Sequence, residues 1–218
     1  MGPSHRASYT HSLTLLSLSM TFATDTTWPG GLLKIFEICR HELQPLEHRY
    51  HGPYNTLLTY CFGPDVLGRN SFQFFVSPQS TPSEFSPCDT VDFVIFLVVF
   101  DVHCRPVLLA EIKDDAWTTK PDLRFKAVEQ MRKRYDSMLA DCPLPRLWGL
   151  SLLGTSVRVY CGDVTTEEVD PAFEDRPSPS RILPRDFLEG AWNFDILSQE
   201  GFAKMKEIVG DIVREAGK

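Results

Sequence analysis

Asp92, Glu111 and Lys113 combine side-chain types and a spacing that could hydrolyse a phosphodiester bond. Glu111 and Lys113 stand in the stretch "VLLAEIKDD" at 107–115, and they share one strand face because strand side chains alternate. Carboxylate oxygens are preferred ligands of hard cations such as Mg²⁺ or Mn²⁺. Such an ion activates a bound water and neutralises a scissile phosphate, while a lysine can orient or deprotonate that water or stabilise the transition state. These residues therefore indicate metal-dependent phosphodiester hydrolysis.

A hairpin in this region would bring Asp92 close to Glu111. The runs 91–100 and 106–112 are rich in β-branched and aromatic residues and flank the polar "DVHCR", which is typical of two antiparallel strands joined by a turn. Residues paired across that turn would have index sums of about 203 to 206, which places Asp92 within a few residues of the position opposite Glu111. The backbone carbonyl of Ile112 would add a further oxygen ligand. Both strands are apolar on both faces, so we expect them in the middle of a sheet that is covered on each side.

Two alternatives accompany this interpretation. Charged residues often mark the point where a strand enters solvent, and "EIKDD" alone fits such a solvated strand end. Asp89 is a second candidate for the metal ligand, but Asp89 and Asp92 would face opposite sides of a strand, so we expect only one of them to serve. The hairpin register favours Asp92.

The rest of the chain supplies elements that could hold such a site. An amphipathic helix is expected at 32–43, with an apolar stripe of Leu32, Ile35, Phe36, Cys39 and Leu43. Further expected elements are a short strand within 70–79, a helix at 122–140, one or two strands within 146–163 and a C-terminal helix at 198–216 with Ser198 as its cap. This order predicts an α/β or α+β fold with a mixed sheet.

Length and composition set further bounds. The 218 residues fit a single domain at 31–218, with a Pro-rich loop at 170–190, preceded by a disordered or loosely attached leader at 1–30. The formal net charge of −7 excludes bulk electrostatic attraction to nucleic acid, so any such binding must be local or assisted by a metal. Six cysteines without a C-x-x-C pair favour free thiols, and no apolar run reaches the roughly 18 residues of a membrane span. We therefore expect an intracellular protein of the cytoplasm or nucleus, without a membrane partner. The alternative is secretion, because "SLTLLSLSMTFA" at 12–23 resembles the apolar region of a signal peptide.

Two other motifs contain residues that could carry chemistry. The stretch "HELQPLEHRYH" at 41–51 lacks a zinc-binding H-E-x-x-H pattern, because Pro45 stands where the second histidine is required. The basic "RKR" at 132–134 could contact phosphates or form a solvated helix face. Gln130 and Arg132 would lie about 200° apart on a helix, so they cannot both point at one site.

The spacing of "VDF" at 91–93 and "EIK" at 111–113 resembles that of the PD-(D/E)XK nuclease superfamily, in which an Asp and a Glu-x-Lys stand on adjacent central strands. Over roughly residues 32–213, a longer pattern resembles a group of largely uncharacterised fungal proteins assigned to that superfamily. The stretches that carry it are "SPQ", "VDFVIFLVVFD", "RPVLLAEIKDD", "EQMRKRY", "LWGLSLLGTSVRVYCGD" and "WNFDILSQEGF". The sequence departs from the family in lacking a literal "PD", since it reads "SPCDTVDF".

The resemblance implies a restriction-endonuclease-like core, in which a mixed sheet of about four strands is flanked by helices in the order αβββαβ. It assigns Asp92 and Glu111 as metal ligands and Lys113 as the catalytic lysine, with Gln130 in support. An additional acid from the first helix would be Glu37 or Glu42. The implied function is a Mg²⁺- or Mn²⁺-dependent nuclease that acts on DNA or RNA. The alternative is a catalytically inactive nuclease-like module that binds protein or nucleic acid, since one fold hosts many functions.

Overall fold

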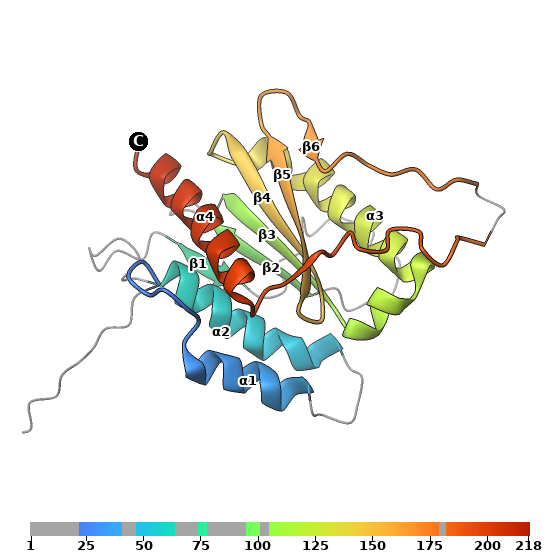
Figure 1. The fold of residues 1–218 in the computed structure, drawn as a ribbon. Coiled ribbons are helices and arrows are strands. Elements are labelled where there is room, and N and C mark those ends of the chain that lie inside the picture. Colours follow the sequence, from blue (N-terminus) through green and yellow to red (C-terminus); the bar gives the residue numbers. More distant parts are fainter. Residues whose placement is uncertain (1–21, 41–46, 64–73, 78–94, 101–104, 179–181) are drawn as a thin grey trace, which may run out of the picture.

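The computed structural model describes residues 22–40, 47–63, 74–77, 95–100, 105–178 and 182–218 (Figure 1). The helices are α1 (Gly30–Arg40), α2 (His51–Phe62), α3 (Pro121–Met138) and α4 (Gln199–Ala216), with short 3₁₀ segments η1 (Glu47–Tyr50), η3 (Asp115–Thr119) and η4 (Leu139–Asp141). The strands are β1 (Phe75–Ser77), β2 (Ile95–Phe100), β3 (Pro106–Lys113), β4 (Arg146–Leu153), β5 (Ser156–Asp163), β6 (Val169–Asp170) and β7 (Phe194–Asp195). Among these described residues no helix has the length and apolar character needed to cross a membrane.

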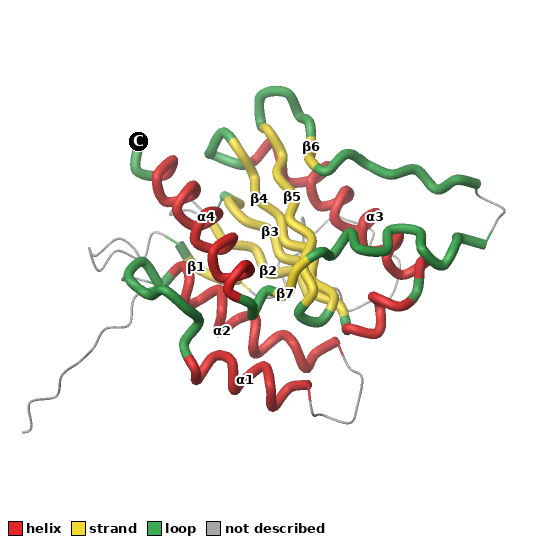
Figure 2. The backbone as a smooth tube through the Cα atoms, in the orientation of Figure 1, coloured by secondary structure: helices red, strands yellow, loops and turns green. Residues whose placement is uncertain are grey.

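The strands form one mixed sheet, in the order β1-β2-β3-β4-β5-β6, with β7 also paired to β5 (Figure 2). The pair β3 and β4 is parallel, and the neighbouring pairs are antiparallel. A parallel pair needs a crossover connection, and α3 provides it between β3 and β4. The prediction of an α+β protein with a mixed sheet flanked by helices is confirmed.

The central strands β3 and β4 are covered on both faces. In β4, Ser151 and Trp148 point to opposite faces because they are three residues apart. Trp148 contacts Asp211 of α4, while the face of Ser151 carries Glu111 of β3, which contacts Arg134 of α3. Helix α3 therefore covers one face and α4 covers the other. Figure 1 shows α1, α2 and α4 grouped together, apart from α3.

Helix α3 approaches the sheet closely at Tyr135. A Cβ atom built on Gly149 would lie 2.6 Å from the Tyr135 hydroxyl, and one built on Gly162 would lie 2.7 Å from its ring. The Tyr135 hydroxyl donates a hydrogen bond to the carbonyl of Leu147 at 3.1 Å. The two glycines thus make room for a buried tyrosine that fixes α3 against β4 and β5.

The expected helices and strands are largely present. Helices α3 and α4 match the predictions at 122–140 and 198–216, and the Ser198 side chain accepts a hydrogen bond from the Gly201 amide at 3.0 Å. The predicted stripe of α1 is correct for Leu32, Phe36 and Cys39, which are buried. It is wrong for Ile35, which is 38% exposed because α2 covers the side of α1 that carries Phe36. The remaining stripe residue, Leu43, lies outside the described residues.

The packed protein extends further toward the N-terminus than the expected leader allows. Phe22 and Trp28 are buried, and their rings stack with centroids 5.9 Å apart. Both rings contact Phe202 of α4, and the Trp28 indole N–H donates to the carbonyl of Ile196 at 2.8 Å. Phe22 and Trp28 therefore belong to the core, because their contacts with α4 hold a segment that was expected to be a leader.

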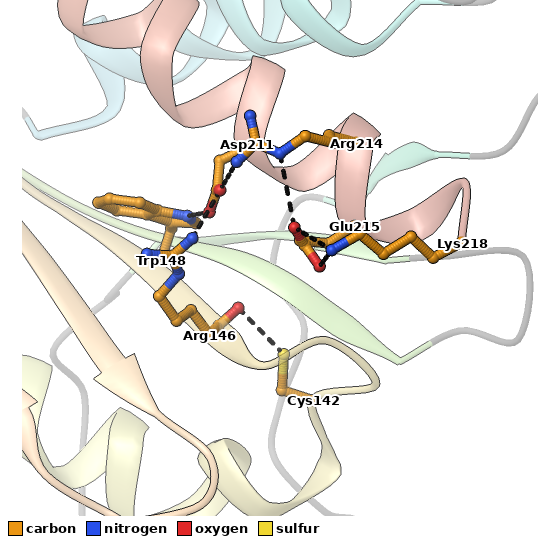
Figure 3. Close-up of polar contacts among 7 residues, drawn as sticks. All are labelled: Cys142, Arg146, Trp148, Asp211, Arg214, Glu215 and Lys218. Carbon is orange, nitrogen blue, oxygen red and sulfur yellow. Dashed lines mark hydrogen bonds and ion pairs between the residues drawn. The ribbon is translucent and has the colours of Figure 1, made fainter.

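A buried carboxylate anchors α4 to the sheet (Figure 3). One oxygen of Asp211 accepts from the Trp148 indole N–H at 2.9 Å, and the other accepts from Arg146 at 2.7 Å and from Arg214. Each of these donors faces a charged acceptor, and hydrogen bonds to charged groups are the stronger kind. Asp211 thus joins α4 to the N-terminal end of β4.

Asp211→Asn is expected to lower the free energy of unfolding by about 1–3 kcal/mol, because the new amide N–H₂ must face one of the donors. Urea unfolding followed by circular dichroism measures this change. Glu207→Gln is the matched control, since Glu207 is an exposed acid of the same helix that pairs with Lys204 at 2.6 Å. Equal unfolding midpoints for the two variants would show that Asp211 does not anchor the helix.

Candidate functional site

Strand β3 delivers Glu111 and Lys113 to the face that α3 covers. Glu111 is 0% exposed and Lys113 is 1% exposed, and Lys113 Nζ lies 3.4 Å from Glu111 Oε1. The prediction that both residues share one face is confirmed. Glu111 and Lys113 are therefore not solvated, whereas Asp115, the last residue of "EIKDD", is exposed.

Helix α3 adds a second cation to Glu111. Arg134 Nε lies 3.6 Å from Glu111 Oε2, so each carboxylate oxygen faces a positive charge. Sequence reasoning placed Arg134 only within a basic cluster that could be solvated. A signal was present, because Arg134 follows Gln130 by four residues and residues at that spacing share a helix face.

Gln130 and Arg132 diverge as expected. The Gln130 side-chain oxygen is buried and has no hydrogen-bond partner in the described part of the chain, and Gln130 lies one turn before Arg134 on α3. Arg132 instead donates to the backbone carbonyls of Val169 and Pro171. Arg132 therefore holds β6 and the loop after it, and the side of α3 that carries Gln130 is the side from which Arg134 reaches Glu111.

The hairpin of β2 and β3 is confirmed, with a register that differs slightly from the expected one. Glu111 pairs with Phe96, four residues after Asp92. Asp92, Asp89 and Glu42 lie outside the described residues. Ile112 lies between Ile95 of β2 and Leu152 of β4, and its side chain is buried on the face opposite Glu111.

The structure does not bring Glu37 to the site. Its carboxylate is exposed on α1, where it pairs with Lys34 at 2.9 Å, one turn earlier on the same helix. Glu111 is buried on the sheet face that α3 covers, whereas α1 is grouped with α2 and α4 (Figure 1). Glu37 therefore has the geometry of a surface ion pair, which contributes little to stability.

The charges around Glu111 determine what it can bind. An ionised carboxylate is costly to bury unless it is paired, and here Lys113 and Arg134 both compensate it. The Lys113 ammonium also lies over the Trp117 ring, 5.2 Å from the centroid. Among the described residues no group of three metal-ligating side chains occurs. Asp92, the second carboxylate that the sequence predicts, lies outside those residues.

The acids that follow Lys113 have a structural role. Asp114 pairs with Arg49 of η1 at 2.9 Å and accepts a hydrogen bond from the Ala116 amide at 2.9 Å, which caps η3. Burial raises the pKa of Asp114, and the Arg49 charge opposes that rise. Burial also disfavours ionised Asp115, but Asp114 and Arg49 lower its pKa overall. These acids fix η1 and η3 at the end of the strand that carries Glu111 and Lys113.

A second set of polar side chains lies on the sheet face that carries Glu111, and it reaches from β4 to β5. Glu111 of β3 is in register with Ser151 of β4, which is in register with Arg158 of β5. The indole N–H of Trp192 donates to Ser151 Oγ at 3.2 Å, and the Arg158 guanidinium lies 5.8 Å from the Trp192 ring. Sequence reasoning did not predict that Ser151 and Arg158 continue the row that begins at Glu111. A signal was present, because Arg158 stands within the otherwise apolar strand "SVRVYCGD".

Tyr160 follows Arg158 on this face. Burial raises the pKa of its phenol to about 12, and the charges of Arg158 and Arg132 act in the opposite direction. Burial lowers the pKa of Arg132, and the nearby Arg158 lowers it further. The guanidinium carbons of Arg158 and Arg132 lie 5.2 and 5.9 Å from the centre of the Tyr160 ring.

Comparison with known proteins finds no matching family model, no matching curated protein and no matching solved structure, so the chemistry of the site has to be inferred from its own residues.

Proposed function

We propose that this protein is a metal-dependent nuclease of the PD-(D/E)XK type, which hydrolyses phosphodiester bonds of DNA or RNA. The main support is the pair of Glu111 and Lys113, whose charged groups lie 3.4 Å apart on one face of a central strand. The element order around them also supports it, because helices precede three strands, and α3 and β4 follow. That order agrees with the αβββαβ core that the resemblance implies.

Each residue has a defined task in this proposal. Glu111, Asp92 and the carbonyl of Ile112 would hold Mg²⁺ or Mn²⁺, which would activate a water and neutralise charge on the phosphate. Lys113 orients the attacking water or stabilises the transition state as a point charge. Gln130 offers a buried oxygen that can accept a hydrogen bond from that water. Arg134 is a positioning residue, because it contacts the carboxylate of Glu111.

One observation favours the second candidate, a non-catalytic nuclease-like module. Both oxygens of Glu111 face cations, at 3.4 and 3.6 Å, so its charge is compensated without a metal ion. In that case Glu111, Lys113 and Arg134 form a structural ion network inside a binding domain. Such a domain would bind nucleic acid or protein without turnover.

A cleavage assay separates the two candidates. The protein is incubated with single- and double-stranded DNA and RNA in the presence of Mg²⁺, Mn²⁺ or EDTA. Cutting that requires the metal supports the nuclease and identifies the polymer. Absence of cutting on all four substrates, together with Mn²⁺ affinity that is unchanged by Glu111→Gln, would favour the binding module.

A further inference from the structure

Two arginines and a tyrosine meet between α3 and β5. The guanidinium carbon of Arg158 lies 5.2 Å from the centre of the Tyr160 ring, and that of Arg132 lies 5.9 Å from it. Arg158 and Tyr160 share the inward face of β5, while Arg132 comes from α3. Residues far apart in the sequence therefore place two positive charges around one phenol.

These groups carry hydrogen-bond donors that the described part of the chain leaves unpartnered. Arg158 is only 5% exposed and Tyr160 is fully buried. Arg158 Nη1, Arg132 Nε and the Tyr160 hydroxyl are buried atoms without a hydrogen-bond partner among the described residues. A buried donor without an acceptor is costly, and such groups are rare in folded proteins. The three groups lie around one ring, so an acceptor with several oxygens would satisfy donors from more than one of them.

The charge of the cluster is also incompletely balanced. Arg158 forms an ion pair with Glu174 at 3.3 Å, and the Glu174 side chain is 52% exposed. Glu174 belongs to the loop after β6, and Arg132 binds the start of that loop through the carbonyls of Val169 and Pro171. In the described part of the chain, Arg158 is thus ion-paired to the half-exposed Glu174, whereas Arg132 is held through backbone carbonyls.

We propose that Arg158, Arg132 and Tyr160 form a binding site for a phosphate group, and that Glu174 occupies its entrance until phosphate displaces it. A guanidinium group presents a planar fork of donors that matches phosphate oxygens, and a phenol hydroxyl can donate to a third oxygen. The loop stays attached during the exchange, because Arg132 holds it through backbone carbonyls. Only the exposed Glu174 side chain has to move.

The position of the cluster suggests the source of the phosphate. Arg158 is two strands from Glu111 on the same sheet face, which corresponds to about 10 Å. In a nuclease, this distance suits a backbone phosphate one or two nucleotides away from the scissile one. This assignment rests on the proposed function, whereas binding of inorganic phosphate does not depend on it.

Titration calorimetry in EDTA tests the site, with inorganic phosphate in one arm and a short single-stranded oligonucleotide in the other. Arg158→Gln is expected to weaken phosphate binding about tenfold or more, because it removes a charged donor fork. Glu174→Gln is expected to strengthen binding by roughly three- to tenfold, because it removes a competing carboxylate. Matched controls are Arg176→Gln, on the same loop, and Glu207→Gln, another half-exposed and ion-paired acid.

The outcomes are decisive in each direction. Phosphate affinity that is absent from the wild type, or unchanged in both Arg158→Gln and Glu174→Gln, overturns the site. If Arg158→Gln does not fold, two other variants test the site. Glu174→Gln should then bind phosphate more tightly than the wild type, and Arg158→Lys should bind it more weakly. Phosphate binding without oligonucleotide binding or cleavage would keep the anion site and reject the nuclease. Cleavage without phosphate binding at Arg158 would keep the nuclease and reject the anion site.

Discussion

Replacing Glu111 with Gln is expected to reduce metal-dependent cleavage by about a thousandfold or more. Glutamine keeps the shape of the side chain and one oxygen, but it removes the charge with which a carboxylate holds a divalent cation. The metal supplies several kcal/mol of transition-state stabilisation, and each 1.4 kcal/mol corresponds to a tenfold change in rate. Single-turnover cleavage of the wild type and the variant, at saturating Mg²⁺, measures the effect.

Lys113→Met tests the second residue of the pair, the proposed catalytic lysine. Methionine fills most of the buried volume without the ammonium group, so the loss is expected to be about a hundredfold to ten-thousandfold. Lys126→Met is the matched control, because Lys126 also lies over the Trp117 ring, at 5.8 Å, but belongs to α3. Cleavage that survives both Glu111→Gln and Lys113→Met would reject the proposed function.

Glu37→Gln tests whether Glu37 only forms a surface ion pair or is the additional acid that the resemblance implies. Glu37 pairs with Lys34 on the exposed side of α1, so cleavage by this variant is expected to equal that of the wild type. The same assay at limiting Mg²⁺ gives the most sensitive comparison. A raised requirement for Mg²⁺ would instead make Glu37 an additional metal-binding acid.

Local patterns explain what could be predicted from the sequence. Helix α3 begins with Pro121 and has Asp122 in its first turn, and its apolar residues recur at helical spacing. The shared face of Glu111 and Lys113 follows from the alternation of side chains in any strand. None of these features depends on distant parts of the chain.

The features that could not be predicted depend on how elements dock. Arg134 meets Glu111 only because α3 lies across β3, and Arg132 reaches the Tyr160 ring only because α3 also borders β5. Phe22 belongs to the core because Phe202, far along the chain, packs against it. Sequence periodicity gives the inward face of an element but not its partner, so these contacts required the structure.

Glu111→Leu is expected to lower the free energy of unfolding by about 3–5 kcal/mol, because it leaves Lys113 and Arg134 buried beside an apolar side chain. Lys113→Leu should cost a similar amount, since it removes one of the two cations that face Glu111. The double variant should be more stable than the sum of the two losses predicts, by roughly 1–3 kcal/mol. Urea unfolding of the four proteins in EDTA closes this double-mutant cycle, and additive losses would mean that the pair does not interact.

Repeating the unfolding experiment with Mn²⁺ connects this stability to function. A ligand that binds only the folded state stabilises it by about 2.7 kcal/mol at a hundred times its Kd. If Glu111 is a metal ligand, Mn²⁺ should stabilise the wild type and leave Glu111→Gln unchanged, whatever the cost of the substitution in EDTA. If Glu111 only balances Lys113 and Arg134, Mn²⁺ should shift both proteins equally or not at all. The ion network alone is compatible with either candidate, so it is the metal dependence of stability that distinguishes a catalytic carboxylate from a structural one.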